Sequence, residues 1–247
     1  MRYLILSDIH ANLAALDAAL EVAKGRWWEA VCLGDVVGYG SRPNEVVDRI
    51  RSLETVTIRG NHDKAVSGLA DADNFNPIAR GVVLWTREQL RPENREYLEK
   101  LPKGPITLGG FSILHGALHD EDEYVFAPAQ ALEGLTDAPS QVSFFGHTHI
   151  QGGFALREGQ VAVLHLKPAG DNLFATLQIE EGTTYLLNPG SIGQPRDGDT
   201  RTGFAIADLD HQFVEFWRVP YDIKDVQAQM SEAGLPESLI LRLSFGR

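Results

Sequence analysis

Eight polar residues of types that bind metals or transfer protons stand at the ends of short apolar runs, at widely separated points of the chain. They are Asp8, His10, Asp35, Asn61, His62, His115, His147 and His149. Carboxylate, imidazole and amide groups together suit borderline divalent metals. Because ligands of open α/β sheets collect outside the carboxyl ends of the strands, we expect these side chains to meet there in a metal site.

The spacing of these residues indicates more than one cation. Residues 8 to 10 and 147 to 149 each carry two candidate ligands separated by one residue. Side chains two residues apart can point the same way just past a strand, so each pair can reach one metal or two adjacent metals. We expect Asp35 to bridge two cations about 3.5–4 Å apart. Such cations lower the pKa of a bound water toward roughly 7 and neutralise charge on phosphoryl oxygens in a transition state.

His62 is expected to have a different role, because it directly follows the candidate ligand Asn61 and should point elsewhere, toward a substrate. We interpret it as a general acid. A protonated imidazole there could donate to a departing alkoxide, which is worth about 10²–10⁴-fold in rate. The alternative is a histidine that only orients a metal ligand by a hydrogen bond.

The elements that must position these residues alternate in the first half of the chain. Apolar runs that suit strands buried on both faces cover residues 3–6, 30–33, 55–58, 111–114, 142–145 and 185–187. Helical patterns at 12–24 and 44–53 separate the first three runs, which predicts parallel pairing. Hairpin signals at 109–110, 157–160 and 208–212 predict an antiparallel second half. An α/β sandwich of two mixed sheets accommodates this order.

Further helices are expected at 78–90 and 93–101, where they would cover one side of the site, and at 128–135 and 222–232. The chain shows no internal repeat and no dividing linker, so we expect residues 1–247 to form a single domain.

Composition restricts the partners. A formal charge of -12 and a pI near 5.1 disfavour binding of long nucleic acid, but a small phosphorylated substrate remains compatible, because two buried cations reverse the local field. No apolar run is long enough to span a membrane and no signal peptide is readable, so no membrane association is expected. The single cysteine, Cys32, excludes an intrachain disulfide and fits a cytoplasmic location. A homo-oligomer is compatible with these data.

Five blocks of the sequence, in this order, resemble the signature blocks of calcineurin-like metallophosphoesterases. They are Asp8-x-His10, Gly34-Asp35, Gly60-Asn61-His62-Asp63, His115-Gly116 and Gly146-His147-Thr148-His149, within a match over residues 1 to about 195. Residues 34–40, 85–87 and 188–196 are similar to the small prokaryotic phosphodiesterase branch that includes the YfcE-like proteins.

The resemblance implies a four-layer αββα fold and two divalent metal ions. It implies one metal held by Asp8, His10, Asp35 and His149, and a second held by Asp35, Asn61, His115 and His147. Members of the family use manganese, iron, nickel or zinc. We expect manganese first and the others as alternatives.

The expected activity is hydrolysis of a small phosphate ester, as a phosphodiesterase or phosphatase, by a hydroxide held between the metals, with His62 as general acid. One alternative is a hydrolase of dinucleoside polyphosphates of the diadenosine tetraphosphate type, so that the substrate could be a nucleotide. Another is a catalytically silent scaffold of the same fold. The presence of every ligand position argues against the scaffold.

Two residues are candidates for substrate binding. Tyr39 could line the pocket and stack on a base, or serve only as a packing anchor. Arg196 could hold a substrate phosphate, or pair with Asp197 or Asp199 at the surface. The stretch from Ala117 to His119 stands where relatives often carry Ser-Pro-Arg. We expect His119 to belong to a solvated acidic loop, and a contact to the substrate is the alternative.

The remaining candidates are expected to be structural. Cys32 should be an inert core thiol, His165 should lie within an apolar strand, and His211 should lie at a turn.

Overall fold

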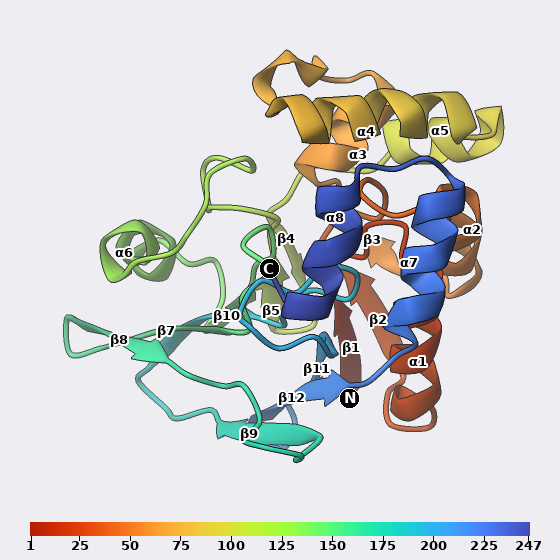
Figure 1. Ribbon diagram of the computed structural model, residues 1–247. Coiled ribbons are helices and arrows are strands. Elements are labelled where there is room, and N and C mark those ends of the chain that lie inside the picture. The colour runs from red at the N-terminus through yellow and green to blue at the C-terminus, as the bar shows by residue number, and fades with distance from the viewer.

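The computed structural model describes residues 1–247, apart from the side chain of Asn74, and its elements form four layers (Figure 1). Two six-stranded sheets pack face to face. Helices α1 (Leu13–Ala23) and α2 (Pro43–Ser52) cover the outer face of one sheet, and α6 (Pro128–Thr136) covers the outer face of the other. The expected αββα sandwich of two mixed sheets is therefore confirmed, whereas the single domain stays a prediction.

The first sheet has the strand order β3-β2-β1-β11-β12-β9. Its strands are β1 (Arg2–Leu6), β2 (Glu29–Cys32), β3 (Val56–Thr57), β9 (Phe174–Gln178), β11 (Thr202–Asp208) and β12 (Phe213–Val219). The pairs β1 with β2 and β2 with β3 are parallel, as the strand and helix alternation predicts, and the other pairs are antiparallel.

The second sheet has the order β4-β5-β6-β10-β7-β8. Its strands are β4 (Ile106–Leu108), β5 (Phe111–Ile113), β6 (Val142–Phe144), β7 (Gly152–Arg157), β8 (Gln160–Leu164) and β10 (Thr184–Asn188). The three predicted hairpins are present. However, β5, β6 and β10 are mutually parallel, so the prediction of an antiparallel second half is wrong there. After β5 the chain passes through α6 and returns to the end of the sheet at which β5 began. It then enters β6, so β5 and β6 run parallel.

Hydrophobic cores on both faces of the first sheet explain why the segments predicted as strands are apolar without interruption. Ile5, Val31, Phe111, Phe144 and Phe216 are all buried between the two sheets. Side chains on the other face of the first sheet pack against α1 and α2. Strands of this kind are buried on both faces, and each fully buried aliphatic or aromatic side chain contributes about 1.5–3 kcal/mol.

The remaining helices lie at one end of the sandwich (Figure 1). They are α3 (Asn61–Ser67), the short helix Ala72–Asn74, α4 (Pro77–Gln89), α5 (Pro92–Glu99), α7 (Ile223–Glu232), α8 (Glu237–Arg242) and the short helix Leu243–Phe245. The sequence patterns missed α3 and α8. Helix α4 begins beside the predicted site, but α5 packs against α3, so only the first of the two covers it. No helix in the described chain is long and apolar enough to cross a membrane.

Candidate metal centre

The predicted ligands converge at the rim where the parallel strands of both sheets end. Two groups of the predicted ligands have ligand atoms that lie within 4.8 Å of one another. The first comprises Asp8, His10, Asp35 and His149, and the second comprises Asp35, His115 and His147. Asp35 belongs to both groups, which is the arrangement expected of a carboxylate that bridges two cations.

Three histidines of these groups are held in a fixed orientation by backbone carbonyl groups. Their Nδ1 atoms lie 2.7–3.1 Å from carbonyl oxygens, namely His10 from Val37, His115 from Leu33 and His149 from Gln194. A nitrogen that donates to a carbonyl carries the ring proton, so the other nitrogen, Nε2, keeps its lone pair for a metal. The backbone thus selects the tautomer that can bind a cation.

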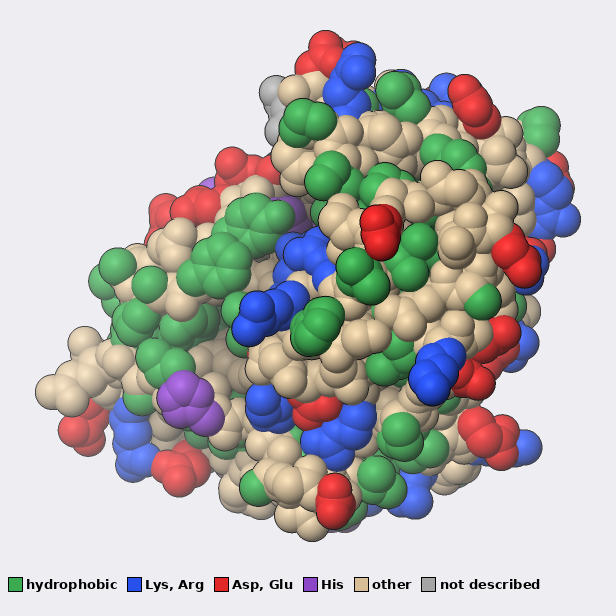
Figure 2. Space-filling view, viewed as in Figure 1, with side chains coloured by type: hydrophobic (Ala, Val, Ile, Leu, Met, Phe, Trp, Pro, Cys, Tyr) green, Lys and Arg blue, Asp and Glu red, His purple; other side chains and the backbone are tan. Residues whose placement is uncertain are grey.

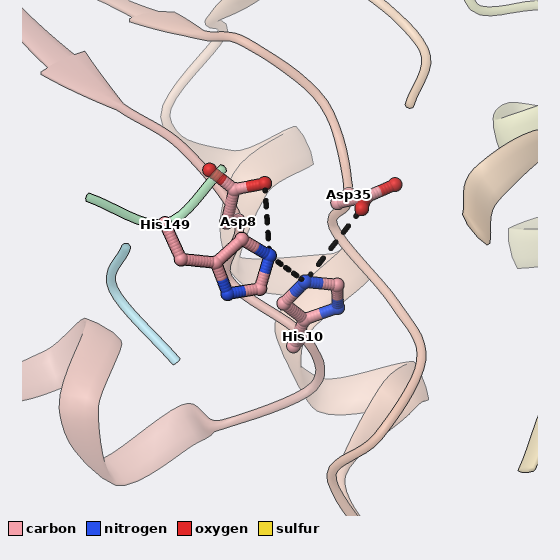
Figure 3. Close-up of side chains that lie close together, drawn as sticks. All are labelled: Asp8, His10, Asp35 and His149. Atoms are coloured by element: carbon pink, nitrogen blue, oxygen red, sulfur yellow. Dashed lines mark hydrogen bonds and ion pairs between the residues drawn. The ribbon is translucent and has the colours of Figure 1, made fainter. Parts of the chain in front are cut away.

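The fit of a cation to the first group follows from these tautomers. Nε2 of His10 and Nε2 of His149 lie 3.0 Å apart, and the two rings face each other beside the carboxylates of Asp8 and Asp35 (Figure 3). Two lone pairs at this distance repel each other, and a shared divalent cation would turn the repulsion into coordination. Nε2 of His149 is also 3.4 Å from Oδ1 of Asp8, and Nε2 of His10 is 3.6 Å from Oδ2 of Asp35.

The second group adds an amide ligand and a different histidine geometry. Nε2 of His115 lies 3.6 Å from Oδ2 of Asp35 and 3.4 Å from Oδ1 of Asn61. In His147 the Nε2 atom lies 3.0 Å from the backbone oxygen of Asp122, so Nδ1 is the nitrogen left for a metal. The phenol ring of Tyr124 stacks on the His147 imidazole at a centroid distance of 3.8 Å. The donor set of both groups therefore fits divalent metals, as expected from the sequence.

Burial makes this site costly for any charged side chain. Burial raises the pKa of Asp8 to about 7 and that of Asp35 well above its usual value. Burial also lowers the pKa of His147 to about 2 and those of His10 and His149 well below their usual value. Bound cations would reverse this for the carboxylates, because an adjacent positive charge favours the ionised form.

The backbone at the site is strained. Five of the predicted ligands have left-handed backbone angles, with φ between 50° and 66°: Asp8, His10, Asp35, His147 and His149. Such a conformation costs about 1–3 kcal/mol for a residue other than glycine, and it is found mostly at functional sites. Hydrogen bonds from the Asp8 and His10 N–H groups to the carbonyl oxygens of Gly34 and Asp35 hold the loops after β1 and β2 together.

His62 lies in the first turn of α3, beside the metal ligands but directed differently. Its ring packs against Tyr39, His10 and Phe75 at centroid distances of 4.4–5.0 Å. Its Nδ1 is buried and has no hydrogen-bond partner among the described residues, so its side chain does not orient a ligand through that atom. Burial, followed by the positive charge of Arg196, lowers the pKa of His62 to about 3.

A cleft of about 370 Å³ opens next to the second group and is lined in part by His62, His147 and Tyr124. Tyr39 also lines this cleft but is only 9% exposed, and its ring is packed against two histidines. The Tyr39 ring is therefore packed as the second alternative expects, while its stacking on a base stays a prediction.

Arg196 lies at the same place, with its guanidinium group 5.7 Å from the centre of the Tyr39 ring. Within the described part of the chain it makes no ion pair, and the two aspartates expected as alternative partners bind other arginines: Asp197 pairs with Arg218 and Asp199 with Arg201. The predicted surface pairing of Arg196 is therefore wrong, and its charge remains directed at the site.

The residues outside the site differ little from expectation. Cys32 is fully buried, and burial raises the pKa of its thiol. His119 is 59% exposed in a loop, near Glu133. His211 is exposed at the β11–β12 turn, as expected, whereas His165 is exposed just past the end of β8 and not within a strand.

Tyr124 and Phe75 also line the cleft, and no pattern in the sequence predicted their place there. Tyr124 follows a run of acidic residues that reads as a solvated loop. In the structure this loop is tied down, because Glu121 and Asp122 accept hydrogen bonds from the Lys64 ammonium group at 2.7–2.9 Å.

Comparison with known proteins agrees with this geometry. Residues 1–212 match the calcineurin-like phosphoesterase superfamily domain, and the chain belongs to this family. It is 35% identical over 257 residues to an uncharacterised protein of Methanocaldococcus jannaschii, covering 98% of this chain and 97% of that protein. The family membership predicted from the sequence is thus confirmed.

Solved structures extend the likeness to the whole chain. A metallophosphoesterase from Sphaerobacter thermophilus is 42% identical, with a TM-score of 0.85 and coverage of 100% of this chain and 99% of that one. A hypothetical protein from Pyrococcus horikoshii has the same fold, with 22% identity, a TM-score of 0.78 and coverage of 100% and 98%.

Proposed function

We propose that this protein is a metal-dependent phosphoesterase that hydrolyses a small phosphate ester, as a phosphodiesterase or phosphatase. The observation that carries the proposal is the pair of ligand groups that share Asp35 and border an open cleft lined by His62. Hydrolysis of phosphate esters is the chemistry for which two adjacent divalent cations are suited.

The two ligand groups would hold two cations. Asp8, His10, Asp35 and His149 would bind the first, and Asp35, Asn61, His115 and His147 the second. When bound, the cations would lower the pKa of water to supply a nucleophile and would neutralise charge on the phosphoryl oxygens. Mixed oxygen and nitrogen donors accept manganese, our first expectation, and also iron, nickel or zinc.

His62 would protonate the departing oxygen. The side chain is neutral before a substrate binds, since burial holds its pKa near 3. A phosphoryl group in the cleft would bring negative charge next to the imidazole, which favours the protonated form. Because the Nδ1 atom has no partner in the described structure, the ring is not committed to another hydrogen bond through that atom.

Arg196 would hold the non-bridging oxygens of the substrate. A guanidinium group offers two parallel N–H donors that match a phosphate, and such charge-assisted bonds are about twice as strong as neutral ones. The high negative charge of the rest of the protein, -12 overall, supports a small substrate and not a long nucleic acid.

Two substitutions test the proposal on the manganese-loaded protein. Asp35→Asn should lose both metals or nearly all turnover, because the bridging carboxylate is common to both groups. His62→Ala should keep its metal content but lose about 10²–10⁴-fold in rate. The matched control is His119→Ala, which removes an exposed imidazole outside the cleft and should turn over normally. Normal turnover by the His62 variant would refute the general-acid assignment.

A substrate panel tests the alternatives. Faster hydrolysis of diadenosine tetraphosphate than of bis-p-nitrophenyl phosphate would favour a dinucleoside polyphosphate hydrolase. No turnover of any mono- or diester with manganese, iron, nickel or zinc would favour a scaffold, and would reject the proposed activity.

A further inference from the structure

The cleft at the metal centre continues into a larger hollow. Tyr39, Asn76 and Ala79 line both the cleft of about 370 Å³ and a second hollow of about 630 Å³. A ligand that reaches the metal ligands could therefore extend past Tyr39 without crossing the protein interior.

The walls of this hollow come from two distant parts of the chain. One wall is the start of α4, with Pro77 and Ile78, and the other is α8, with Ser238, Leu239 and Arg242. Helix α8 lies beyond residue 212, where the match to the family domain ends. The shape of this part of the cleft is thus set by the C-terminal segment of this chain.

Two arginines lie near Tyr39, which lines both the cleft and the hollow: the Arg196 guanidinium is 5.7 Å from the centre of its ring, and Arg242 lines the hollow. Oε1 of Gln194 accepts hydrogen bonds from Arg196 at 3.1 Å and from Arg242 at 3.2 Å. Neither guanidinium group pairs with an acidic side chain of the described residues, and Nε of Arg196 is buried without a partner there. A single amide oxygen does not offset two positive charges, so the pair is suited to bind an anion.

The two arginines connect the metal site with the hollow. The backbone N–H of Arg196 donates to the backbone carbonyl oxygen of the metal-site residue His149 at 3.2 Å, and Arg242 lies in the wall of the hollow. Figure 2 shows Lys and Arg side chains gathered in a hollow of this face, beside hydrophobic side chains and below a histidine. Arg196 thus adjoins the metal site through its backbone and shares the Gln194 oxygen with Arg242, which lines the hollow.

We propose that Arg196 and Arg242 form a second anion site, and that the substrate is a phosphoester with a second phosphate whose organic part occupies the hollow between α4 and α8. This inference rests on the proposed function and adds the class of substrate to it. The phosphate that is cleaved lies at the metal centre, where Arg196 also reaches its oxygens, and the second phosphate lies between the guanidinium groups of Arg196 and Arg242. Leu239 and Ile78 contact the organic part.

A matched pair of substrates tests the proposal on the manganese-loaded enzyme. Thymidine 5′-(p-nitrophenyl phosphate) and its 3′-phosphorylated derivative differ only in the second phosphate. We expect kcat/KM to be about tenfold higher for the derivative, the size of one charge-assisted hydrogen-bonded contact. In Arg242→Met the ratio of the two kcat/KM values should fall toward one. In Arg242→Lys, which keeps the positive charge, the ratio should stay close to that of the wild type.

The control is Arg91→Met, which removes one charge that pairs with Asp48 outside the cleft and should keep the wild-type ratio. Thermal unfolding of each variant checks that α8 stays folded. A wild-type ratio near one, or a ratio that Arg242→Met leaves unchanged, would overturn the second anion site.

A binding experiment separates this inference from the proposed function. Calorimetric titration of the full-length protein with adenosine 5′-phosphate, in the presence of a chelator, reports on the arginine pair without turnover. Arg242→Met should weaken binding about tenfold and Arg91→Met should leave it unchanged. If the enzyme shows no turnover but this binding is found, the proposed activity fails and the anion site stands. If the phosphate binds no better than adenosine, the anion site is refuted.

Discussion

Gly38 offers a way to displace His62 without changing a metal ligand. It follows β2 in the loop that carries Asp35, with φ at +94°, and its Cα faces the His62 imidazole. A methyl group added at this position would lie 2.5 Å from Nδ1 and 2.9 Å from Cγ of His62. Gly38→Ala therefore has two separable effects, one on the backbone and one on the ring.

The size of each effect follows from this geometry. Ordinary contacts of a Cβ atom begin at 3.4 Å, so the ring must move by about 1 Å, and a misplacement of that size can cost about 10²-fold in rate. The left-handed backbone costs alanine about 1–2 kcal/mol relative to glycine. We expect a modest loss of stability and a large loss of turnover.

The assay compares two esters of one nucleotide, the p-nitrophenyl and the methyl ester of thymidine 5′-phosphate. p-Nitrophenolate leaves as a stable anion and needs little protonation, whereas an alkoxide needs a general acid. The rate loss should therefore be larger on the methyl ester, by up to about 10²-fold. Metal content, measured by plasma mass spectrometry, should equal that of the wild type.

Gly159→Ala is the matched control. Gly159 also has a positive φ, +77°, but nothing lies within 4 Å of the added methyl group. Its variant should show a similar loss in free energy of unfolding and normal turnover. If Gly38→Ala keeps its metal and slows both esters equally, then His62 does not act on the leaving group and the assignment is wrong.

Three further predictions concern the surroundings of the site. Arg218 is buried against Asp197, and Arg218→Met should cost about 3–5 kcal/mol in urea unfolding, because it leaves a poorly exposed carboxylate unpaired. Arg59 also holds Glu121, so Lys64→Met should loosen the loop mainly at Asp122, whose backbone oxygen contacts the imidazole of His147, and should weaken metal binding about tenfold in calorimetry. Because burial raises the pKa of Asp8 to about 7, metal binding should release protons below pH 7 and progressively fewer above it; calorimetry in buffers of different ionisation enthalpy measures the number.

The sequence predicted the site best where a candidate ligand directly follows a strand. Asp8, Asp35, His115 and His147 each follow an apolar run, and parallel pairing brings such ends together. The pairing of β5 with β6 was predicted wrongly, because the hairpin signals on either side outweighed a short apolar helix that makes the crossover. The hydrophobic periodicity and the secondary-structure propensity of a segment do not show which strands become neighbours in a sheet.

Other features depended on tertiary contacts. The α3 helix was missed because its seven residues carry no apolar stripe; it is stabilised by burial and by the Asp63 carboxylate, which accepts a hydrogen bond from the Gly60 N–H. Tyr124 lines the cleft and Arg242 lines the hollow only because distant segments of the chain fold against the site. Neither residue has a neighbour in the sequence that would indicate its role.

The origin of the ligands in the chain also bears on when the protein can acquire its metals. The first group takes side chains from the loops after β1, β2 and β6, and the second from the loops after β2, β5 and β6, so each draws on both sheets. During synthesis the N-terminal half emerges first. Neither group is complete until residues 115–149 have left the ribosome, so a complete metal site would form only after the first three strands have emerged.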